Sequence, residues 1–378
     1  MRRYARVMPP AAVRPDELLF PDLITRAERR ELQREPEPRL FYQSMGAGVQ
    51  STAIALMAAQ GVIPKPDYAV FADTGNEPKV VYQHLERLER EVLDPAGIVL
   101  VRVAAGNIYD EAIDPHFPRS LPLYTRDRKT GAAGGITTRA CTVNFKLIAI
   151  YRWLREQLGG TVTEQQCRFC QGTGERNAPW MVKAGMAGAY GICSVCRGVG
   201  KVRKVGQPEK GAWARCYVGF SADEIYRVSP SRVSYAFDHF PLIGLDQAQQ
   251  ALHPDLSMTR DECEQYNTAQ GFPEVVKSAC EICPWHSDVE WRQIKADPEQ
   301  WQRVVAADRA LRHIPGLDNE AFLHKARIPL EEVNFSDGAA DAERPSCSPY
   351  GCRSGADTDS ISAPSLFDDD WIDVERTA

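Results

Sequence analysis

The stretch that most constrains the fold lies between residues 40 and 59, where the sequence changes character twice. An apolar run of strand length leads to Gly46 and Gly48, a Ser51-Thr52 pair follows, and a segment of helix formers comes next. This order predicts a strand, a tight loop and the start of a helix. The N–H groups of such a loop bind anions, so the stretch is a candidate phosphate-binding loop. The alternative interpretation is an ordinary turn with Ser51 or Thr52 as the helix N-cap.

Further strands and helices alternate along the chain and predict an α/β fold. β-prone runs occupy residues 67–72 and 98–103, and a helical periodicity covers residues 79–93 between them. Strand, helix, strand, helix, strand is the order of a parallel sheet covered on both faces. We also expect a helix that ends near Leu158 and a fourth strand at residues 214–220.

Composition divides the chain into five segments. Residues 1–38, rich in Arg, Pro and Glu, are expected to be a mobile lead-in, and residues 337–378, which are acidic and polar, a disordered tail. The α/β domain is expected to occupy residues 39–163 and to resume within residues 207–336, which also hold a helical part. A cysteine-rich insert at residues 164–206 separates the two.

Three finer expectations concern the connections. Residues 104–138 mix glycine, proline and charge, which predicts a long loop. Ser221 is expected to cap a short helix. Residues 256–330 are expected to be helical, with breaks at 271–273 and 280–284.

Charge and cysteine content indicate the compartment. The formal net charge is −6, which gives no overall attraction to nucleic acid, and no run of about 18 apolar residues predicts a membrane span. Eleven cysteines occur, mostly in close pairs, and in a reducing compartment such pairs indicate metal binding rather than disulfides. We therefore expect a cytoplasmic protein with no membrane partner.

The insert carries the strongest local motif. Cys167 and Cys170 form a Cys-x-x-Cys pair followed by two glycines, and Cys193 and Cys196 repeat the pattern. Four thiolates at this spacing predict a tetrahedral zinc site that would hold a polar segment together. The motif resembles the cysteine-rich zinc module of DnaJ-type chaperones. Redox thiols or another metal are the alternatives.

The insert is also basic within an acidic protein. Its positive side chains are Arg168, Arg176, Lys183, Arg197, Lys201, Arg203 and Lys204. They make nucleic acid a candidate partner, and ordinary solvated charge is the alternative.

A second Cys-x-x-Cys pair, Cys280 and Cys283, precedes a proline. Two thiolates do not complete a metal site, and Cys141, in a polar loop that opens a helix, is the best further ligand. The three predict an iron–sulfur cluster or a zinc site, with a redox dithiol or a structural role as alternatives. Cys216 is expected in the core, and Cys263 on a helix face.

Two more cysteines, Cys347 and Cys352, lie in the predicted tail. They could act as nucleophile and resolving thiol, supply a cluster ligand, or have no role.

Charged residues near the expected strand ends are further candidates. Asp73 ends the second strand, where a carboxylate can hold Mg²⁺ or a ribose hydroxyl, or else cap a helix. The same two interpretations apply to Asp223 and Glu224. Candidate phosphate partners are Arg139, Lys146 and Arg227.

These motifs together resemble the phosphoadenosine phosphosulfate (PAPS) reductase family of the PP-loop ATP pyrophosphatase superfamily. Residues 44–51 resemble the family's Ser-x-Ser-Gly-Gly-x-Asp-Ser loop, with Gly46 in place of a serine and Gln50 in place of the aspartate. Residues 73–75 resemble its Asp-Thr-Gly motif. The cysteines at 141, 280 and 283 resemble those of iron–sulfur sulfurtransferases that modify DNA or tRNA.

The resemblance implies a Rossmann-like domain of the adenine nucleotide alpha-hydrolase type. It implies a site for ATP or a PAPS-like nucleotide built from Ser44, Gly46, Ala47, Gly48, Val49, Gln50, Ser51, Asp73, Thr74, Gly75, Arg139 and Lys146. The implied activity is adenylation of a substrate, followed by sulfur transfer, with Asp73 and Cys141 as catalytic residues and Mg²⁺ and a [4Fe–4S] cluster as cofactors. The sequence specifies neither the acceptor nor the sulfur donor.

Two other functions are weighed beside this one. A thiol-dependent PAPS reductase would use Cys347 or Cys352 as its nucleophile, although the reductases' C-terminal Glu-Cys-Gly motif is missing. A regulator that binds a nucleotide and holds nucleic acid or protein through the insert would perform no chemistry.

Overall fold

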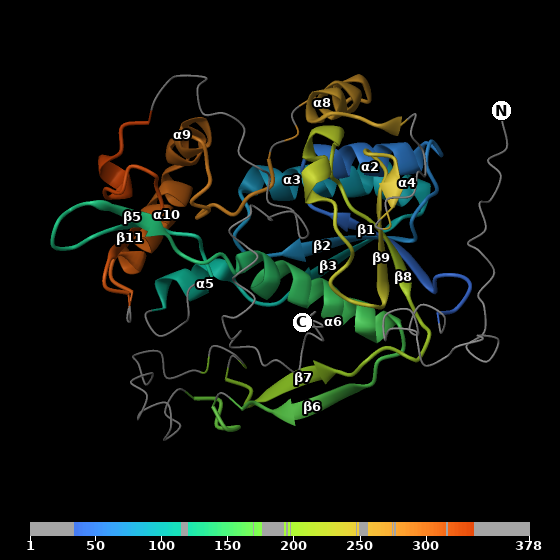
Figure 1. Ribbon diagram of the computed structural model, residues 1–378, viewed down its shortest axis with the longest axis horizontal. Coiled ribbons are helices and arrows are strands. Elements are labelled where there is room, and N and C mark those ends of the chain that lie inside the picture. The colour runs from blue at the N-terminus through green and yellow to red at the C-terminus, as the bar shows by residue number, and fades with distance from the viewer. Residues whose placement is uncertain are drawn as a thin grey trace, which may run out of the picture.

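The computed structural model describes most of the chain between residues 34 and 335. The described residues are 34–114, 120–168, 170–175, 193, 196, 198–246, 248, 256–273, 275, 277–314 and 317–335. They form a six-stranded sheet with helices on both faces, a smaller lobe beside one end of that sheet, and a two-stranded sheet beyond helix α6 (Ile148–Gln157) (Figure 1).

The large sheet is mostly parallel. Its strands, in spatial order, are β10 (Leu245–Asp246), β9 (Ala236–Phe240), β8 (Ala214–Tyr217), β1 (Leu40–Met45), β2 (Tyr68–Asp73) and β3 (Val99–Ala104). The terminal strand β10 alone runs antiparallel to its neighbour. β1 and β2 are buried along nearly their whole length, as expected of apolar runs in a parallel sheet covered on both faces.

The order of the strands reverses direction at β1. The chain proceeds from β1 to β2 and β3 on one side, then returns to place β8 and β9 on the other side of β1. The loops that follow β1 and β8 lie next to each other at the carboxyl edge of the sheet. Open α/β sheets bind their ligands at this kind of switch point.

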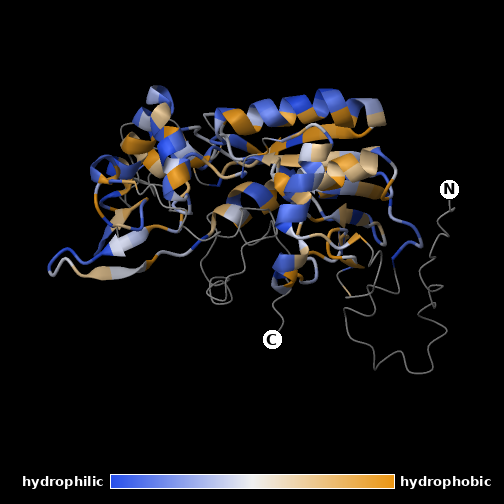
Figure 2. Ribbon diagram, turned by 90° about the horizontal axis from the view of Figure 1, so that it is seen from above, coloured by the Kyte–Doolittle hydropathy of each residue, from blue (hydrophilic) through white to orange (hydrophobic). Residues whose placement is uncertain are grey.

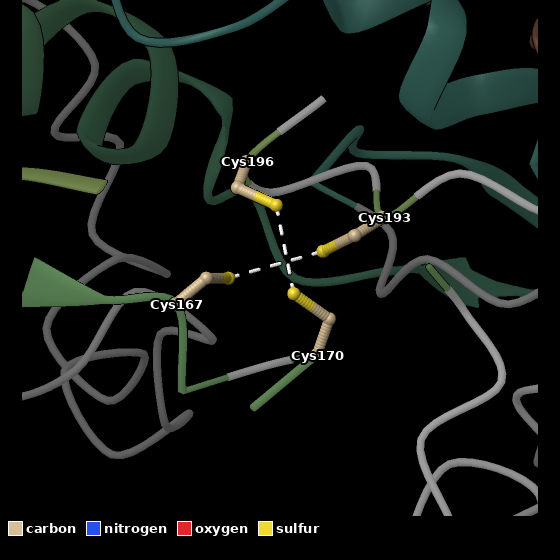
Figure 3. Close-up of side chains that lie close together, drawn as sticks. All are labelled: Cys167, Cys170, Cys193 and Cys196. Carbon is tan, nitrogen blue, oxygen red and sulfur yellow. Dashed lines mark hydrogen bonds between the residues drawn. The ribbon is translucent and has the colours of Figure 1, made fainter. Parts of the chain in front are cut away.

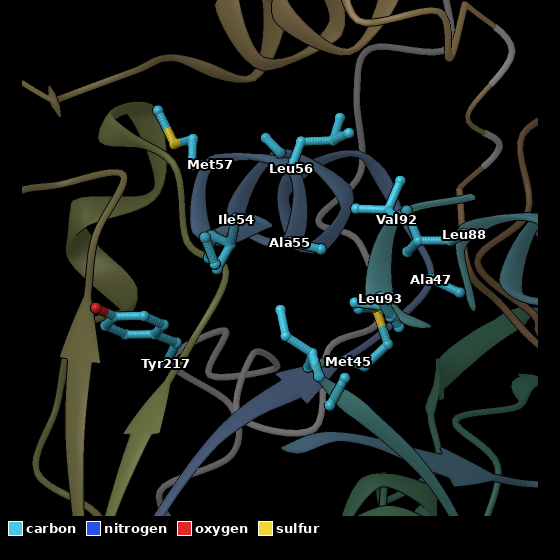
Figure 4. Close-up of a cluster of buried hydrophobic side chains, with 14 of the residues drawn as sticks. Met45, Ala47, Ile54, Ala55, Leu56, Met57, Leu88, Val92, Leu93 and Tyr217 are labelled. Atoms are coloured by element: carbon cyan, nitrogen blue, oxygen red, sulfur yellow. The ribbon is translucent and has the colours of Figure 1, made fainter. Parts of the chain in front are cut away.

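Helices α2 (Val49–Ala59) and α3 (Lys79–Leu88) cover one face of the sheet, and α8 (Arg260–Ala269) packs on the outer side of α2 (Figure 1). Nearly all of α2 is buried, because it lies between the sheet and α8, and its many alanines allow close packing. In Figure 4, Met45 of β1 and Ile54 of α2 lie in this core, with Tyr217 to one side. A π-helical turn, η3 (Glu89–Leu93), and α4 (Asp94–Ala96) continue α3.

The opposite face is covered by one helical unit. A π-helical turn, η4 (Thr142–Leu147), leads into α6 (Ile148–Gln157). Leu147, Ile150 and Leu154 pack against Tyr42 and Val70 of the sheet in a second core. Coloured by hydropathy, the helices show both hydrophobic and hydrophilic residues along their turns, as expected where one side is buried (Figure 2).

The smaller lobe has its own core. Its elements are α5 (Ile108–Ile113), β4 (Tyr124–Arg126), β5 (Ala133–Ile136), α9 (Asp288–Ala296), α10 (Pro298–Leu311), β11 (Glu320–Phe322) and the 3₁₀ turn η7 (Leu330–Glu332). The strands form a sheet in the order β11-β4-β5. Trp291, fully buried, is the largest side chain of this core, which also includes Cys280.

Two short elements complete the described fold. β6 (Val162–Gln166) and β7 (Lys201–Val205) pair antiparallel and form the base of the cysteine-rich insert. A 3₁₀ helix, η5 (Ala222–Arg227), follows β8, and Ser221 and Glu224 form a capping box at its start.

The structure confirms the α/β class and the mostly parallel sheet, and corrects several sequence-based expectations. Residues 104–138 are not one long loop, because α5, β4 and β5 lie within them. Residues 256–330 include β11 besides helices, and the insert contains two strands. In the part of the chain described, no helix is long and apolar enough to cross a membrane.

Candidate functional site

The glycine loop joins β1 to α2 at the switch point. Gly48 is the N-cap of α2, so Ser51 and Thr52 are not, contrary to the turn interpretation of the sequence. The Ser51 hydroxyl lies at the third helical position, where it accepts a hydrogen bond from Gly48 N (3.1 Å) and donates one to Gly48 O (3.0 Å). Ala47 has a left-handed backbone (φ 54°), which folds the loop back over the end of β1.

The loop after β8 touches the glycine loop directly. A Cβ atom placed on Gly219 would lie 3.2 Å from Ser51 N and 3.4 Å from the carbonyl carbon of Gln50. Glycine therefore permits the two switch-point loops to approach. At the end of β1, the Ser44 hydroxyl and Gln43 Oε1 are buried without a hydrogen-bond partner, and such atoms are rare in proteins unless a ligand or water satisfies them.

Gln50 is held by residues that follow β8. Its Nε2 donates to Glu224 Oε2 (3.2 Å) and lies 3.4 Å from Ser221 Oγ. Glu224 forms a buried ion pair with Arg227, whose guanidinium stacks on Phe220 at 4.5 Å. Arg227, predicted as a phosphate partner, is thus committed to Glu224, and Asp223 accepts from Arg260 N (3.0 Å).

Asp73 ends β2 at the same edge, as the sequence predicts. Its Oδ1 accepts hydrogen bonds from Gly75 N (2.8 Å) and from the Tyr82 hydroxyl (2.7 Å), and it does not cap α3, whose N-cap is Pro78. Burial and the bond to Asp73 raise the pKa of Tyr82, so the phenol stays protonated and donates. Both bonds use Oδ1, which leaves Oδ2 available to a ribose hydroxyl or a metal ion.

A buried carboxylate that the sequence analysis overlooked, Glu77, connects the predicted motifs. Its side chain has no exposed surface, and its Oε1 lies 3.3 Å from Thr74 Oγ1 and 3.5 Å from Lys146 Nζ. The Ser278 hydroxyl donates to Oε2 (3.4 Å), and the Cys280 thiol lies 3.8 Å from Oε1. One carboxylate thus joins the end of β2, the turn η4 and the second Cys-x-x-Cys segment.

Cys280 lies at the predicted nucleotide edge. Its Sγ is 3.1 Å from Thr74 Oγ1, and the residue is 6% exposed. The loop of Cys141 reaches the same segment, because the Arg139 guanidinium stacks on Trp285 at 4.3 Å. Cys141 packs at the border of the lobe core that contains Cys280.

These thiols do not form a compact metal-binding group. Among the described His, Cys, Asp and Glu side chains, only the cysteines of the insert gather closely enough to hold a metal ion. An iron–sulfur cluster at Cys141, Cys280 and Cys283 therefore stays a prediction of the sequence, and so does a Mg²⁺ site at Asp73.

The four cysteines of the insert converge as predicted. Cys167, Cys170, Cys193 and Cys196 are buried, and their sulfur atoms all lie within 4.8 Å of one another (Figure 3). The Cys167–Cys193 and Cys170–Cys196 sulfur distances are 3.9 and 3.5 Å. A tetrahedral Zn²⁺ with Zn–S bonds of about 2.3 Å spaces its sulfurs by about 3.8 Å. The group could therefore hold a metal ion of this size.

The two halves of the insert have matching geometry. Gly174 N donates to Cys170 Sγ (3.3 Å), and Gly200 N donates to Cys196 Sγ (3.2 Å). A Cβ on Gly174 would lie 2.2 Å from Gly198 O, and one on Gly200 would lie 2.2 Å from Gly172 O. Gly174 and Gly200 have φ of 76° and 74°. The glycines of the motif are thus required by conformation and by close approach.

The surroundings of Cys170 favour loss of the proton from its thiol. Burial raises the pKa of Cys170, but the hydrogen bonds from the Gly174 N–H and the neighbouring thiols together lower it by more. The net result is a pKa that falls from 9.0 to about 7. Metals bind thiolates, and a lower pKa reduces competition from protons.

Other basic residues and cysteines singled out in the sequence pair with acidic side chains, are buried, or lie outside the described residues. Lys201 pairs with Glu164 (3.5 Å), and Arg203 pairs with Glu156, so both basic side chains already have acidic partners. Cys216 and Cys263 are buried, as expected. Outside the described residues lie Arg176, Lys183, Arg197, Cys347 and Cys352.

No family model, curated protein or solved structure matches this chain. The fold and the site define an α/β protein with a mostly parallel sheet and a buried group of four cysteines that could hold a metal.

Proposed function

We propose that this protein binds ATP or a related adenine nucleotide at the carboxyl edge of its parallel sheet and uses it to adenylate a substrate for sulfur transfer. The observation that carries this proposal is the convergence of three segments at one edge. These are the glycine loop after β1, residues 73–75 after β2, and the Cys280 thiol beside Thr74. Each was a separate motif in the sequence.

The glycine loop would hold the phosphates. The space beside Gly48 is largely unfilled, because a Cβ placed on this residue would meet only Ser278, at 3.7 to 3.8 Å. The N–H groups of the first turn of α2 and the helix dipole favour a negative charge there. The unpartnered Ser44 hydroxyl offers a further polar contact beneath the loop.

Asp73 would contact the ribose or a metal ion through Oδ2, because Oδ1 is occupied by Gly75 and Tyr82. A Mg²⁺ ion bound there would neutralise phosphate charge. Lys146, one of the predicted phosphate partners, pairs with Glu77 and would act on a ligand only by leaving or sharing that carboxylate.

The position of Cys280 supports sulfur transfer as the proposed chemistry. In the proposed reaction a substrate oxygen attacks the α-phosphorus of ATP, pyrophosphate leaves, and a sulfur nucleophile then displaces AMP from the activated carbon. A thiol beside Thr74 is close to where the adenylate would form. The sulfur donor must be a separate molecule, and no step is assigned to an iron–sulfur cluster.

The insert would carry a structural Zn²⁺ at Cys167, Cys170, Cys193 and Cys196. Four thiolate ligands close the coordination sphere and leave no open position for catalysis. Its contribution would be to fold residues 164–206, whose strands β6 and β7 bury little surface of their own.

A non-catalytic nucleotide-binding regulator is favoured by one observation. Gln50 stands where the resembling family has an acid, and its amide is held by Glu224, whose charge is paired with Arg227. The loop therefore presents no carboxylate from this position. Tight ATP binding without pyrophosphate release would favour this alternative.

Gly48→Val tests the proposal with a matched control. The valine side chain would fill the space over the loop, so we expect ATP binding, measured by calorimetry, to weaken at least tenfold. Release of pyrophosphate, measured with cellular RNA and metabolite extracts as acceptors, should disappear. Gly135→Val on β5, where an added Cβ meets nothing within 4 Å, should behave like wild type. Wild-type binding and turnover in Gly48→Val would contradict the proposal.

A further inference from the structure

The buried residue Asn76, which follows β2, contacts the segment that carries Cys280 through its backbone and its side chain. Asn76 O accepts from Glu281 N (2.7 Å), and Asn76 Oδ1 accepts from Ile282 N (3.2 Å). Its Nδ2 donates to Glu281 Oε2 (3.2 Å). The backbone and both polar atoms of the amide thus contact two successive residues, and Asn76 is 6% exposed.

Glu281 extends this connection into the smaller lobe. It is 2% exposed, and Arg303 of α10 binds it with two nitrogens, Nη2 to Oε1 at 2.8 Å and Nε to Oε2 at 3.2 Å. His286 Nε2 lies 2.8 Å from Cys280 O and fixes the other side of the same peptide. A bidentate pair to a buried carboxylate defines an orientation as well as a distance.

The result is a fixed position for one thiol. Asn76 holds residues 281 and 282, and the preceding residue, Cys280, is thereby kept with its sulfur 3.1 Å from Thr74 Oγ1. Thr74 and Asn76 are only two residues apart on the segment that follows β2. A small movement of the lobe would therefore separate the thiol from the predicted nucleotide edge.

We propose that Asn76, with Glu281 and Arg303, is a positioning element that holds the Cys280 thiol at the nucleotide edge and links the smaller lobe to it. The role in sulfur transfer rests on the proposed function, but the placement of Cys280 does not. The group acts through Cys280 and is not itself assigned to the chemistry.

The rate of Cys280 alkylation tests this placement. The full-length protein, purified anaerobically and with its metal content recorded, is treated with iodoacetamide, and each cysteine peptide is followed by mass spectrometry. Asn76→Ala removes two buried hydrogen bonds, each contributing about a fivefold factor, so Cys280 should react about 25-fold faster than in wild type. Cys216 and Cys263, in the cores of the α/β domain, should keep their wild-type rates.

Asn267→Ala is the matched control. Asn267 is also a buried asparagine, and its Nδ2 donates to Val49 O (2.9 Å) from α8. Its replacement should increase the alkylation rate of Cys263, which lies on α8, and leave the alkylation rate of Cys280 unchanged. Equal acceleration of all cysteines in Asn76→Ala would indicate general destabilisation and overturn the positioning role.

A charge test separates positioning from loss of packing. Asn76→Asp keeps the acceptor for Ile282 N but sets a carboxylate against Glu281, so Cys280 should react faster than in wild type. Adding Glu281→Gln to Asn76→Asp restores a hydrogen-bond donor between residues 76 and 281. The rate of Cys280 alkylation should then return most of the way to the wild-type rate. No rescue, an unchanged rate in Asn76→Ala, or iron bound through Cys280 would each overturn the proposal.

Adding ATP separates this proposal from the proposed function. If ATP slows Cys280 alkylation in wild type, the result supports both the placement of Cys280 and the proposed function. If the Asn76 variants respond as expected and ATP has no effect, the placement stands and its use in nucleotide-dependent sulfur transfer is overturned.

Discussion

Replacement of Gly174 by alanine should disrupt the metal site of the insert. The residue has φ of 76°, where alanine costs about 1–2 kcal/mol. The added Cβ would also lie 2.2 Å from Gly198 O, so the backbone must shift by roughly 1 Å to reach ordinary contact. That shift breaks the Gly174 N–H bond to Cys170 Sγ, which contributes about 1 kcal/mol more. The sum of about 2–3 kcal/mol corresponds to a loss of about 30- to 150-fold in zinc affinity.

Competition with a chromophoric zinc chelator measures this loss in the full-length protein. Gly131→Ala is the control, because Gly131 has φ of 71° and an added Cβ there meets nothing within 4 Å. It should lower stability by about 1–2 kcal/mol and leave zinc affinity unchanged. Gly200→Ala should match Gly174→Ala, since the two halves of the insert share their geometry. Zinc affinity in Gly174→Ala within threefold of wild type would refute the reasoning.

Three further predictions concern buried charge. Burial raises the pKa of Asp238 from 3.8 to about 8, so its contribution to stability is full below about pH 4 and lost as the pH rises through 8. In Asp238→Asn, the Tm should depend less on pH over this range and should be higher than the wild-type Tm at pH 8.5. A Tm no higher than that of wild type at pH 8.5 would contradict this. Burial and the charge of Arg87 lower the pKa of His84 from 6.5 to about 4, so stability is full above about pH 6.5 and falls as the pH drops through 4. His84→Gln should reduce the difference between the free energies of unfolding measured in urea at pH 7 and at pH 4.5. A difference as large as that of wild type would count against it. Arg227→Met should cost about 3–5 kcal/mol by isolating the buried Glu224 carboxylate, and adding Glu224→Gln should recover most of it; a double variant no more stable than the single one would show that packing rather than charge is lost.

The strands β1, β2 and β3 could be predicted because apolar, β-prone residues predominate in them. β1, β2 and β3 each stand out as runs of strand length, and glycines and polar residues mark where they end. The four-cysteine group was equally accessible, because two identical spacings with two glycines each leave little choice of partner.

Other strands were missed because polar residues interrupt their patterns. β9 contains Asp238 and His239 within five residues, and β6 is exposed along its whole length. The short strand β5 pairs with its sequence neighbour β4, whereas β11 pairs with β4 across nearly 200 residues of sequence. No local signal announces such a pairing.

The polar contacts of the site depend on long-range geometry. Glu77 reads as one more surface acid in the sequence, yet it joins Thr74 to Lys146, and Ser278 to the same carboxylate. Asn76 is similar, since its role follows from main-chain groups about 205 residues away. Polar side chains at the carboxyl end of a predicted parallel strand are the one signal that could have singled them out.

Photoaffinity labelling with 8-azido-ATP, followed by peptide mapping, tests the central claim most directly, because it reports both whether an adenine nucleotide binds and where. The claim predicts labelled peptides from the carboxyl edge of the sheet, within residues 44–51, 73–77 or 218–224, and loss of that label when ATP is added or Gly48 is replaced by valine. Label confined to other segments, or label that excess ATP does not displace, would contradict it.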